Sequence, residues 1–275
     1  MYKTETSPIQ LEILVSTLNR NSLDFLEVMF QNNTISDYQI LVINQTSEDC
    51  TLHSNDSNIR IINSYEKGLS KSRNLAIENA IGHICLLADD DIVYIKGFEK
   101  PILESYSKLD NADVITFQTL TTESRPYSNY PKQTLKLKGF SKMVLSIEIT
   151  FKRESIVKSS IRFNEHFGLG ATFQDSENYI FLTDLMKLKK INLFFAPEFI
   201  VIHKPFSSSG DIVSDRFMFA RSALYYKLYG NAVYIYVLKL IFYLLRKKLI
   251  KFDEIGPKFR VAHSAIKTYK QLNIQ

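Results

Sequence analysis

The sequence predicts an α/β fold with a mostly parallel sheet, followed by a C-terminal helical region. Short apolar runs alternate with helix-like segments between residues 11 and 88, which is typical of parallel sheets covered by helices. Polar residues follow three of the expected strands. Ligands of such sheets bind outside the carboxyl ends of the strands, so we expect a site there. The 275 residues, 45% hydrophobic and 23% charged, suffice for one large domain with an appendage.

The first half of the chain supplies the expected elements in regular order. Four short apolar runs bounded by polar or turn-forming residues are typical of strands. They cover residues 11–18, 38–43, 60–62 and 84–88. Apolar residues at helical spacing predict helices over 22–30 and 70–80. Ser70 is a candidate N-cap of the second helix, and Gly82 is its candidate stop.

The second half is predicted to contain longer loops. Strands are expected over 113–119, 146–151, 191–195 and 199–203. Helices are expected over 154–159 and 176–188, and a long loop over 120–138. Gly168 and Gly170 bracket one residue, which indicates a tight backbone path.

Three adjacent carboxylates, Asp89, Asp90 and Asp91, directly follow the strand predicted at 84–88. Such like charges repel one another, and burial raises the cost of their ionisation. An Asp-rich solvated turn is one explanation. A divalent cation is the other, since Mg²⁺ binds one or two carboxylates together with substrate phosphates. In an extended segment residues i and i+2 share a side, so Asp89 and Asp91 are expected to face one site, with Asp90 turned away.

Four motifs between about residues 11 and 205 together resemble the family 2 glycosyltransferases with a GT-A fold. Residues 15–20 are similar to the end of the first nucleotide-binding strand, and 68–77 to the helix start Gly-hydrophobic-Ser…Arg-Asn. Residues 87–91 look like the Asp-x-Asp metal motif, and 163–178 resemble the acceptor-side segment that ends in the catalytic carboxylate. The second and third motifs together are the specific evidence for this family, and either of them alone would be weak. The resemblance implies a Rossmann-like, mostly parallel mixed sheet with flanking helices.

The resemblance also implies an activity and its site. It implies inverting transfer of a sugar from a nucleotide-sugar donor, with a UDP-sugar as the first candidate. Mn²⁺ or Mg²⁺ would neutralise the charge that grows on the leaving diphosphate. The expected metal ligands are Asp89, Asp91 and His203. The residues expected to contact the nucleotide are Thr17, Asn19, Arg20, Asn44, Ser70, Arg73, Asn74, Asp89 and Asp90.

The expected general base is where this sequence departs from the family. An inverting transfer needs a base for the acceptor hydroxyl, and the resemblance implies an acidic pair whose second member is commonly that base. Here the pair is Glu177 and Asn178, and an amide cannot take up the proton. Glu177 and Asp175 are the two candidates. Because of Asn178, an alternative is that the protein is a catalytically inactive GT-A module that binds nucleotide and acts as a scaffold subunit. A nucleotidyltransferase is a weaker rival, because residues 19–22 are not a Gly-rich phosphate loop.

The C-terminal region combines an apolar segment with a basic cluster. Tyr236, Lys239, Tyr243 and Arg246 would form a narrow polar stripe on a helix, and Arg246, Lys247, Lys248 and Lys251 follow as the cluster. No run reaches 18 apolar residues, so a membrane span is not expected. Residues 231–251 suit an interfacial helix on anionic lipid. The alternatives are packing on the catalytic domain and a homodimer interface.

The bulk properties limit partners and location. A net charge of +5 is too small to indicate nucleic acid. Cys50 and Cys85 are better explained as free thiols than as a disulfide. The N-terminus lacks the apolar core of a signal peptide. We therefore expect a cytoplasmic protein, peripheral on the inner face of the membrane, with a catalytic domain at 1–210 and a helical region at 211–275. Its acceptor would be a saccharide or lipid-linked saccharide in polysaccharide or glycolipid synthesis.

Overall fold

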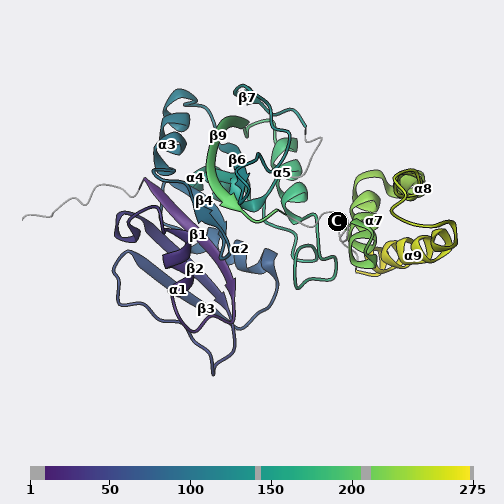
Figure 1. Ribbon diagram of the computed structural model, residues 1–275, viewed down its shortest axis with the longest axis horizontal. Helices are drawn as coiled ribbons and strands as arrows, with labels where there is room; N and C mark the ends of the chain where they lie inside the picture. Colours follow the sequence, from purple (N-terminus) through teal and green to yellow (C-terminus); the bar gives the residue numbers. More distant parts are fainter. Residues whose placement is uncertain (1–9, 140–143, 206–211, 273–275) are drawn as a thin grey trace, which may run out of the picture. The chain divides into compact units, whose positions relative to one another are not determined.

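The computed structural model describes residues 10–139, 144–205 and 212–272 (Figure 1). The chain divides into two compact units. The first comprises residues 1–164 and 178–205, and the second comprises residues 165–177 and 206–275. The segment 165–177 therefore packs with the C-terminal helices, although it lies inside the range 1–210 expected for the catalytic domain.

The first unit is built on a mixed sheet with the strand order β3-β2-β1-β4-β8-β6-β9-β5, and β7 pairs with β9. The strands β1 to β4 are Leu11–Leu18, Gln39–Gln45, Ile59–Ser64 and Ile84–Asp89. These four pair in parallel. The strands β5 to β9 are Val93–Tyr94, Val114–Thr121, Leu135–Lys136, Ile149–Lys152 and Leu193–His203. The predicted α/β class is confirmed. The strands β3, β2, β1 and β4 form a continuous parallel block, and β6 and β9 form a second parallel pair.

Helices cover both faces of this sheet (Figure 1). On one face lie α1 (Asp24–Met29) and α3 (Glu99–Lys108), which pack on the core formed by alternate residues of β1. The other face is covered by α2 (Leu69–Asn79), α4 (Arg153–Ser159) and α5 (Glu177–Lys187). Strands buried on both faces are nearly continuous apolar runs, as in the stretch Ile40–Ile43.

Several predicted elements differ in detail. No helix was predicted over α3, whose first turn contains Pro101. The strand expected at 146–151 begins instead with the 3₁₀ turn η2 (Ser146–Glu148). The strands expected at 191–195 and 199–203 form the single strand β9, which passes through Pro197. Its pairing with β6 shifts register next to this point, and such irregularities are where a sheet tolerates proline.

Within the described residues 212–272, the second unit contains the helices α7 (Asp215–Tyr229), α8 (Val233–Arg246) and α9 (Ile255–Gln271), with the 3₁₀ turns η3 (Gly230–Ala232) and η4 (Phe252–Glu254). Phe173 joins segment 165–177 to them, with its ring centroid 5.4 Å from that of Phe219 and 5.9 Å from that of Tyr269. Met218 of α7 and buried apolar residues of α8 and α9 form a hydrophobic core in this unit.

One stretch of the described chain, Asp215–Arg246, is long and apolar enough by composition to cross a membrane. The backbone divides this stretch, because α7 ends at Tyr229 and is capped by Gly230, whose φ of 54° favours glycine. The 14 residues of α8 span only about 21 Å at 1.5 Å per residue. A hydrocarbon core of roughly 30 Å needs a longer helix.

Candidate active site

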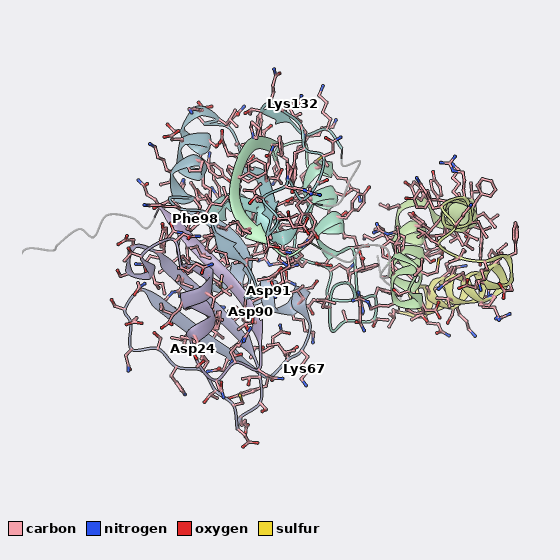
Figure 2. The ribbon with its side chains drawn as sticks, in the orientation of Figure 1. Asp24, Lys67, Asp90, Asp91, Phe98 and Lys132 are labelled. Atoms are coloured by element: carbon pink, nitrogen blue, oxygen red, sulfur yellow. The ribbon has the colours of Figure 1, made fainter. Side chains whose placement is uncertain are left out.

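The polar residues that follow β1, β2 and β4 converge at one edge of the sheet. Leu18 pairs with Gln45, and Ser16 pairs with Asp89, so the three parallel strands end together. Figure 2 labels Asp90 and Asp91 in this region. The convergence predicted from the sequence is confirmed.

Arg73 of α2 is the buried cation of this site. Its side chain is only 2% exposed, and its Nη2 donates to Asp89 Oδ1 at 3.0 Å. Its Nη1 donates to Asn178 Oδ1 at 2.9 Å, and the guanidinium lies over the Phe163 ring, 5.5 Å from the ring centroid. A buried charge is tolerated only when it is paired and hydrogen-bonded. Arg73 therefore fixes Asp89 and the first turn of α5 around one cation.

Asp89 has a second partner that the sequence did not reveal. Ser146 Oγ donates to Asp89 Oδ2 at 2.9 Å. Ser146 lies in η2, within the segment predicted to be a strand. A single serine without a motif carries no signal that could have identified this contact.

Asp90 does not point away from the site. Strand β4 ends at Asp89 and a turn follows, so strand alternation cannot be extended to Asp90 and Asp91. Asp90 Oδ2 accepts hydrogen bonds from Thr17 Oγ1 and from Arg20 Nε, the latter at 2.7 Å. This carboxylate thus joins the end of β4 to the end of β1.

Asp91 pairs with His203 at the end of β9. His203 Nε2 lies 3.5 Å from Asp91 Oδ2. The imidazole lowers the pKa of Asp91, and the carboxylate raises the pKa of His203. Among the described residues no three His, Cys, Asp or Glu side chains are gathered as a metal cluster. Of the three predicted metal ligands, this contact joins Asp91 and His203, whereas Asp89 is hydrogen-bonded to Arg73 and Ser146.

Asn44 and Asn19 shape the backbone at the end of β1. Asn44 is fully buried. Its Oδ1 accepts from Arg20 N at 3.1 Å, and its Nδ2 donates to Arg20 O at 2.9 Å and to Asn63 Oδ1 at 3.1 Å. Asn19 has a φ of 52°, a conformation that asparagine adopts more readily than most residues. Asn44 therefore fixes the position of Arg20, and a direct contact with a nucleotide base stays a prediction.

The start of α2 differs from the prediction for Ser70. The helix begins at Leu69 with Gly68 as its N-cap, at a φ of 131°, and Ser70 is buried in the first turn. Gly68 N donates to Gln45 Oε1 at 2.7 Å, which connects this turn to the end of β2. Asn74 binds Phe163 on both sides, accepting from its N at 2.8 Å and donating to its O at 3.0 Å.

Glu148 is a buried acid beside the site. It accepts hydrogen bonds from Thr119 Oγ1 at 2.9 Å, from Tyr130 Oη, and from Leu145 N at 3.1 Å. Burial raises the pKa of Glu148 to about 7. Because these bonds hold η2 in place, Glu148 positions Ser146 and, through it, Asp89.

The two candidate bases belong to segment 165–177 of the second unit. Asp175 Oδ1 accepts from Ser176 Oγ at 2.9 Å and lies 3.6 Å from Arg221 Nη2 of α7. Glu177 is the first residue of α5 and is 9% exposed. Asp175 is thus tied to the C-terminal helices, whereas Glu177 directly precedes Asn178, which binds Arg73.

Comparison with solved structures identifies the fold. A crystal structure of Staphylococcus aureus TarS 1-349 in complex with UDP is similar, with a TM-score of 0.55, 14% identity, and coverage of 95% of this chain and 81% of that chain. The same TarS fragment in complex with UDP-GlcNAc has a TM-score of 0.55 and 13% identity, covering 92% and 79%. In a longer S. aureus TarS structure, with a TM-score of 0.51 and 14% identity, the match covers 79% of this chain but only 40% of that chain.

The sequence itself gives the family. No match to a curated protein was found. The family model described as Glycosyl transferase family 2 matches residues 12–175, which is more than half of the chain and includes Arg73 and the three aspartates. The fold and this match agree with the GT-A resemblance. The chain therefore belongs to glycosyl transferase family 2.

Proposed function

We propose that the protein is an inverting glycosyltransferase that moves a sugar from a UDP-sugar to a saccharide or lipid-linked saccharide. The observation that carries the proposal is the buried pairing of Arg73 with Asp89 at the carboxyl ends of β1, β2 and β4. This edge is where α/β sheets bind ligands. The binding of UDP and UDP-GlcNAc by the S. aureus TarS fragment supports a UDP-sugar as the donor.

Asp91 and His203 fit a divalent cation. Their carboxylate and imidazole lie 3.5 Å apart, and Mg²⁺ or Mn²⁺ sites commonly use few protein ligands because substrate phosphates supply the others. In this proposal Asp91 and His203 would hold the cation, and Asp89 is the third candidate ligand. When bound, the ion supplies positive charge against the departing diphosphate.

Arg20 and Arg73 have separate roles in the proposal. Arg20 is partly exposed, with 42% of its side chain accessible, and pairs with Asp90. It can therefore bind a phosphate or the ribose at the surface. Arg73 is enclosed by Asp89, Asn178 and Phe163, so it orients the carboxylate rather than binding the donor directly.

Glu177 is the proposed general base. Asn178 Oδ1 accepts from Arg73, and adjacent Cα atoms lie about 3.8 Å apart, so the backbone of Glu177 is held next to this contact. Asp175 is bonded to Ser176 and paired with Arg221, which supports a structural role for that carboxylate. Asp175 remains the alternative base.

The proposal is tested with a panel of UDP-, GDP- and ADP-sugars, measuring release of the nucleoside diphosphate with Mn²⁺, with Mg²⁺ and with a chelator. We expect release from one donor class, dependent on the cation. Calorimetry with UDP and Mn²⁺ separates the rivals. Binding without any turnover, also in the presence of saccharide acceptors, would favour an inactive scaffold subunit. Release of pyrophosphate from a nucleoside triphosphate and a sugar phosphate would establish a nucleotidyltransferase.

A further inference from the structure

Helix α8 has two apolar sides, and only one of them is covered. Val233, Val237, Ile241 and Leu244 are buried in the core of the second unit. On the opposite side Ile235 is 56% exposed, Leu238 54% and Phe242 68%. Positions i, i+3 and i+7 share a helix face. The apolar residues of 231–251 therefore fall into two groups. One group packs in the core of the second unit, and the other forms an exposed stripe.

Cations lie on the same stripe and at its end. Lys239 and Arg246 are exposed and follow Ile235 by 4 and 11 residues, which places them on the face of Leu238 and Phe242. Three further exposed lysines follow the helix, namely Lys247, Lys248 and Lys251. An exposed apolar face bordered by lysine and arginine is typical of a helix that lies in a membrane interface.

Phe252 is a further exposed apolar side chain, which follows the cations in the sequence. It lies in η4, directly after Lys251, and is 83% exposed. A largely exposed aromatic side chain next to a lysine cluster is unfavourable on a free surface, because burying a phenylalanine is worth roughly 1.5–3 kcal/mol. Its position therefore indicates a surface that is covered in use.

The charge of this region indicates which kind of partner covers the exposed face of α8. Between Asp215 and Asp253 the chain has no acidic residue, whereas eight basic residues occur there, namely Arg216, Arg221, Lys227, Lys239, Arg246, Lys247, Lys248 and Lys251. Nearby, Glu254 Oε2 accepts from Lys251 N, and Asp215 pairs with Lys258. A two-fold interface between copies of this chain would bring the like-charged clusters together. An anionic lipid surface complements them.

We propose that Ile235, Leu238, Phe242 and Phe252, with Arg246, Lys247, Lys248 and Lys251, form a docking surface for an anionic phospholipid membrane. Helix α8 is too short to span a bilayer, so it lies in the interface with its exposed stripe toward the acyl chains. The lysines contact the headgroups. This inference needs no assumption about the donor or the reaction.

The test is co-sedimentation of the full chain with vesicles of phosphatidylcholine alone or mixed with phosphatidylglycerol. We expect binding to the mixed vesicles, weakened by added salt because exposed charges are screened. Leu238→Ser with Phe242→Ser should lower the partition coefficient at least about tenfold. Lys247→Glu with Lys248→Glu should lower it at least about tenfold as well, since one basic residue near the surface is worth roughly fivefold.

Matched controls lie in the first unit. Lys189 and Lys190 are also consecutive exposed lysines, so Lys189→Glu with Lys190→Glu makes the same charge change elsewhere. Val28 and Ile81 are 57% and 51% exposed, and Val28→Ser with Ile81→Ser controls for the apolar substitutions. Thermal unfolding of each variant verifies that it is folded.

Three results would overturn the proposal. The first is equal binding to both vesicle types, and the second is an equal loss of binding in the control pairs. The third is a dimer in solution that Leu238→Ser with Phe242→Ser converts to a monomer, which would make a second copy the occupant. The assay contains no nucleotide, so its outcome is independent of glycosyl transfer.

Discussion

Arg73 donates a 2.9 Å hydrogen bond from Nη1 to Oδ1 of Asn178, at the position where the family resemblance implies an acid. Asp89 already pairs with the same guanidinium, so an amide at 178 gives Nη1 of the buried cation an acceptor without adding charge. A second carboxylate there would give the site an excess negative charge. The departure at Asn178 thus has a structural explanation that does not require an inactive protein.

Removing this amide should destabilise the protein. Asn178→Ala leaves Arg73 Nη1 without this acceptor, and a lost bond to a charged group costs about 1.5–3 kcal/mol. We expect the free energy of unfolding, measured by urea denaturation, to fall by about that amount. Asn111→Ala, at an exposed position, is the control. If Asn178→Ala lowers the free energy of unfolding no more than the control does, the hydrogen bond makes no net contribution to stability.

The strands β1, β2 and β4 could be predicted because they are buried on both faces of the sheet. A continuous apolar run such as Ile40–Ile43 is therefore enough to identify the strand. The strands β5 and β7 have two residues each, too few for any periodicity. Helix α3 was missed although Ile102, Leu103 and Tyr106 have helical spacing, and its Pro101 lies in the first turn, where proline is tolerated.

Only those residues of the site that lie in a recognisable sequence motif could be predicted. Arg73 and the aspartates lie in such motifs. Ser146 and Glu148 act through contacts between distant parts of the chain, since Ser146 lies 57 residues from Asp89 and Glu148 lies 29 residues from Thr119. Their neighbours in sequence resemble a strand and give no indication of a buried acid.

The pairing of Asp91 with His203 predicts a metal-dependent step. Asp91→Asn and His203→Ala should each lower transfer roughly 100-fold or more, because charge stabilisation by a metal is worth several kcal/mol. Both should also remove the Mn²⁺ dependence of UDP binding, measured by calorimetry. Asp56→Asn, in an exposed loop, should change neither. Full activity of Asp91→Asn would place the metal elsewhere.

The raised pKa of Glu148 predicts that the folded protein loses stability as the pH rises from acidic to neutral values. Its pKa in the folded protein is about 7, above that of an unfolded glutamate near 4.3. The folded state therefore binds more protons between these values, so stability is highest below the unfolded pKa and falls as pH rises through the folded pKa. The loss should be about 2–4 kcal/mol between pH near 4.5 and pH near 8.

The variant Glu148→Gln should flatten this dependence, because glutamine does not titrate. Urea denaturation midpoints across this pH range provide the measurement. Glu104→Gln, at an exposed helix position, should keep the slope of the parent protein. A parent slope that survives in Glu148→Gln would assign the titration to another group.

The last prediction separates the two candidate bases. Glu177→Gln preserves shape but removes the group that takes up the proton, and general base catalysis contributes about 10²- to 10⁴-fold. Transfer should fall by that factor while UDP affinity stays unchanged, as measured by kinetics and calorimetry on the same samples. Asp175→Asn should instead lower stability by roughly 1 kcal/mol, because its carboxylate pairs with Arg221 and Ser176. If Asp175→Asn abolishes transfer and Glu177→Gln does not, Asp175 is the base, and the contact with Arg221 orients it.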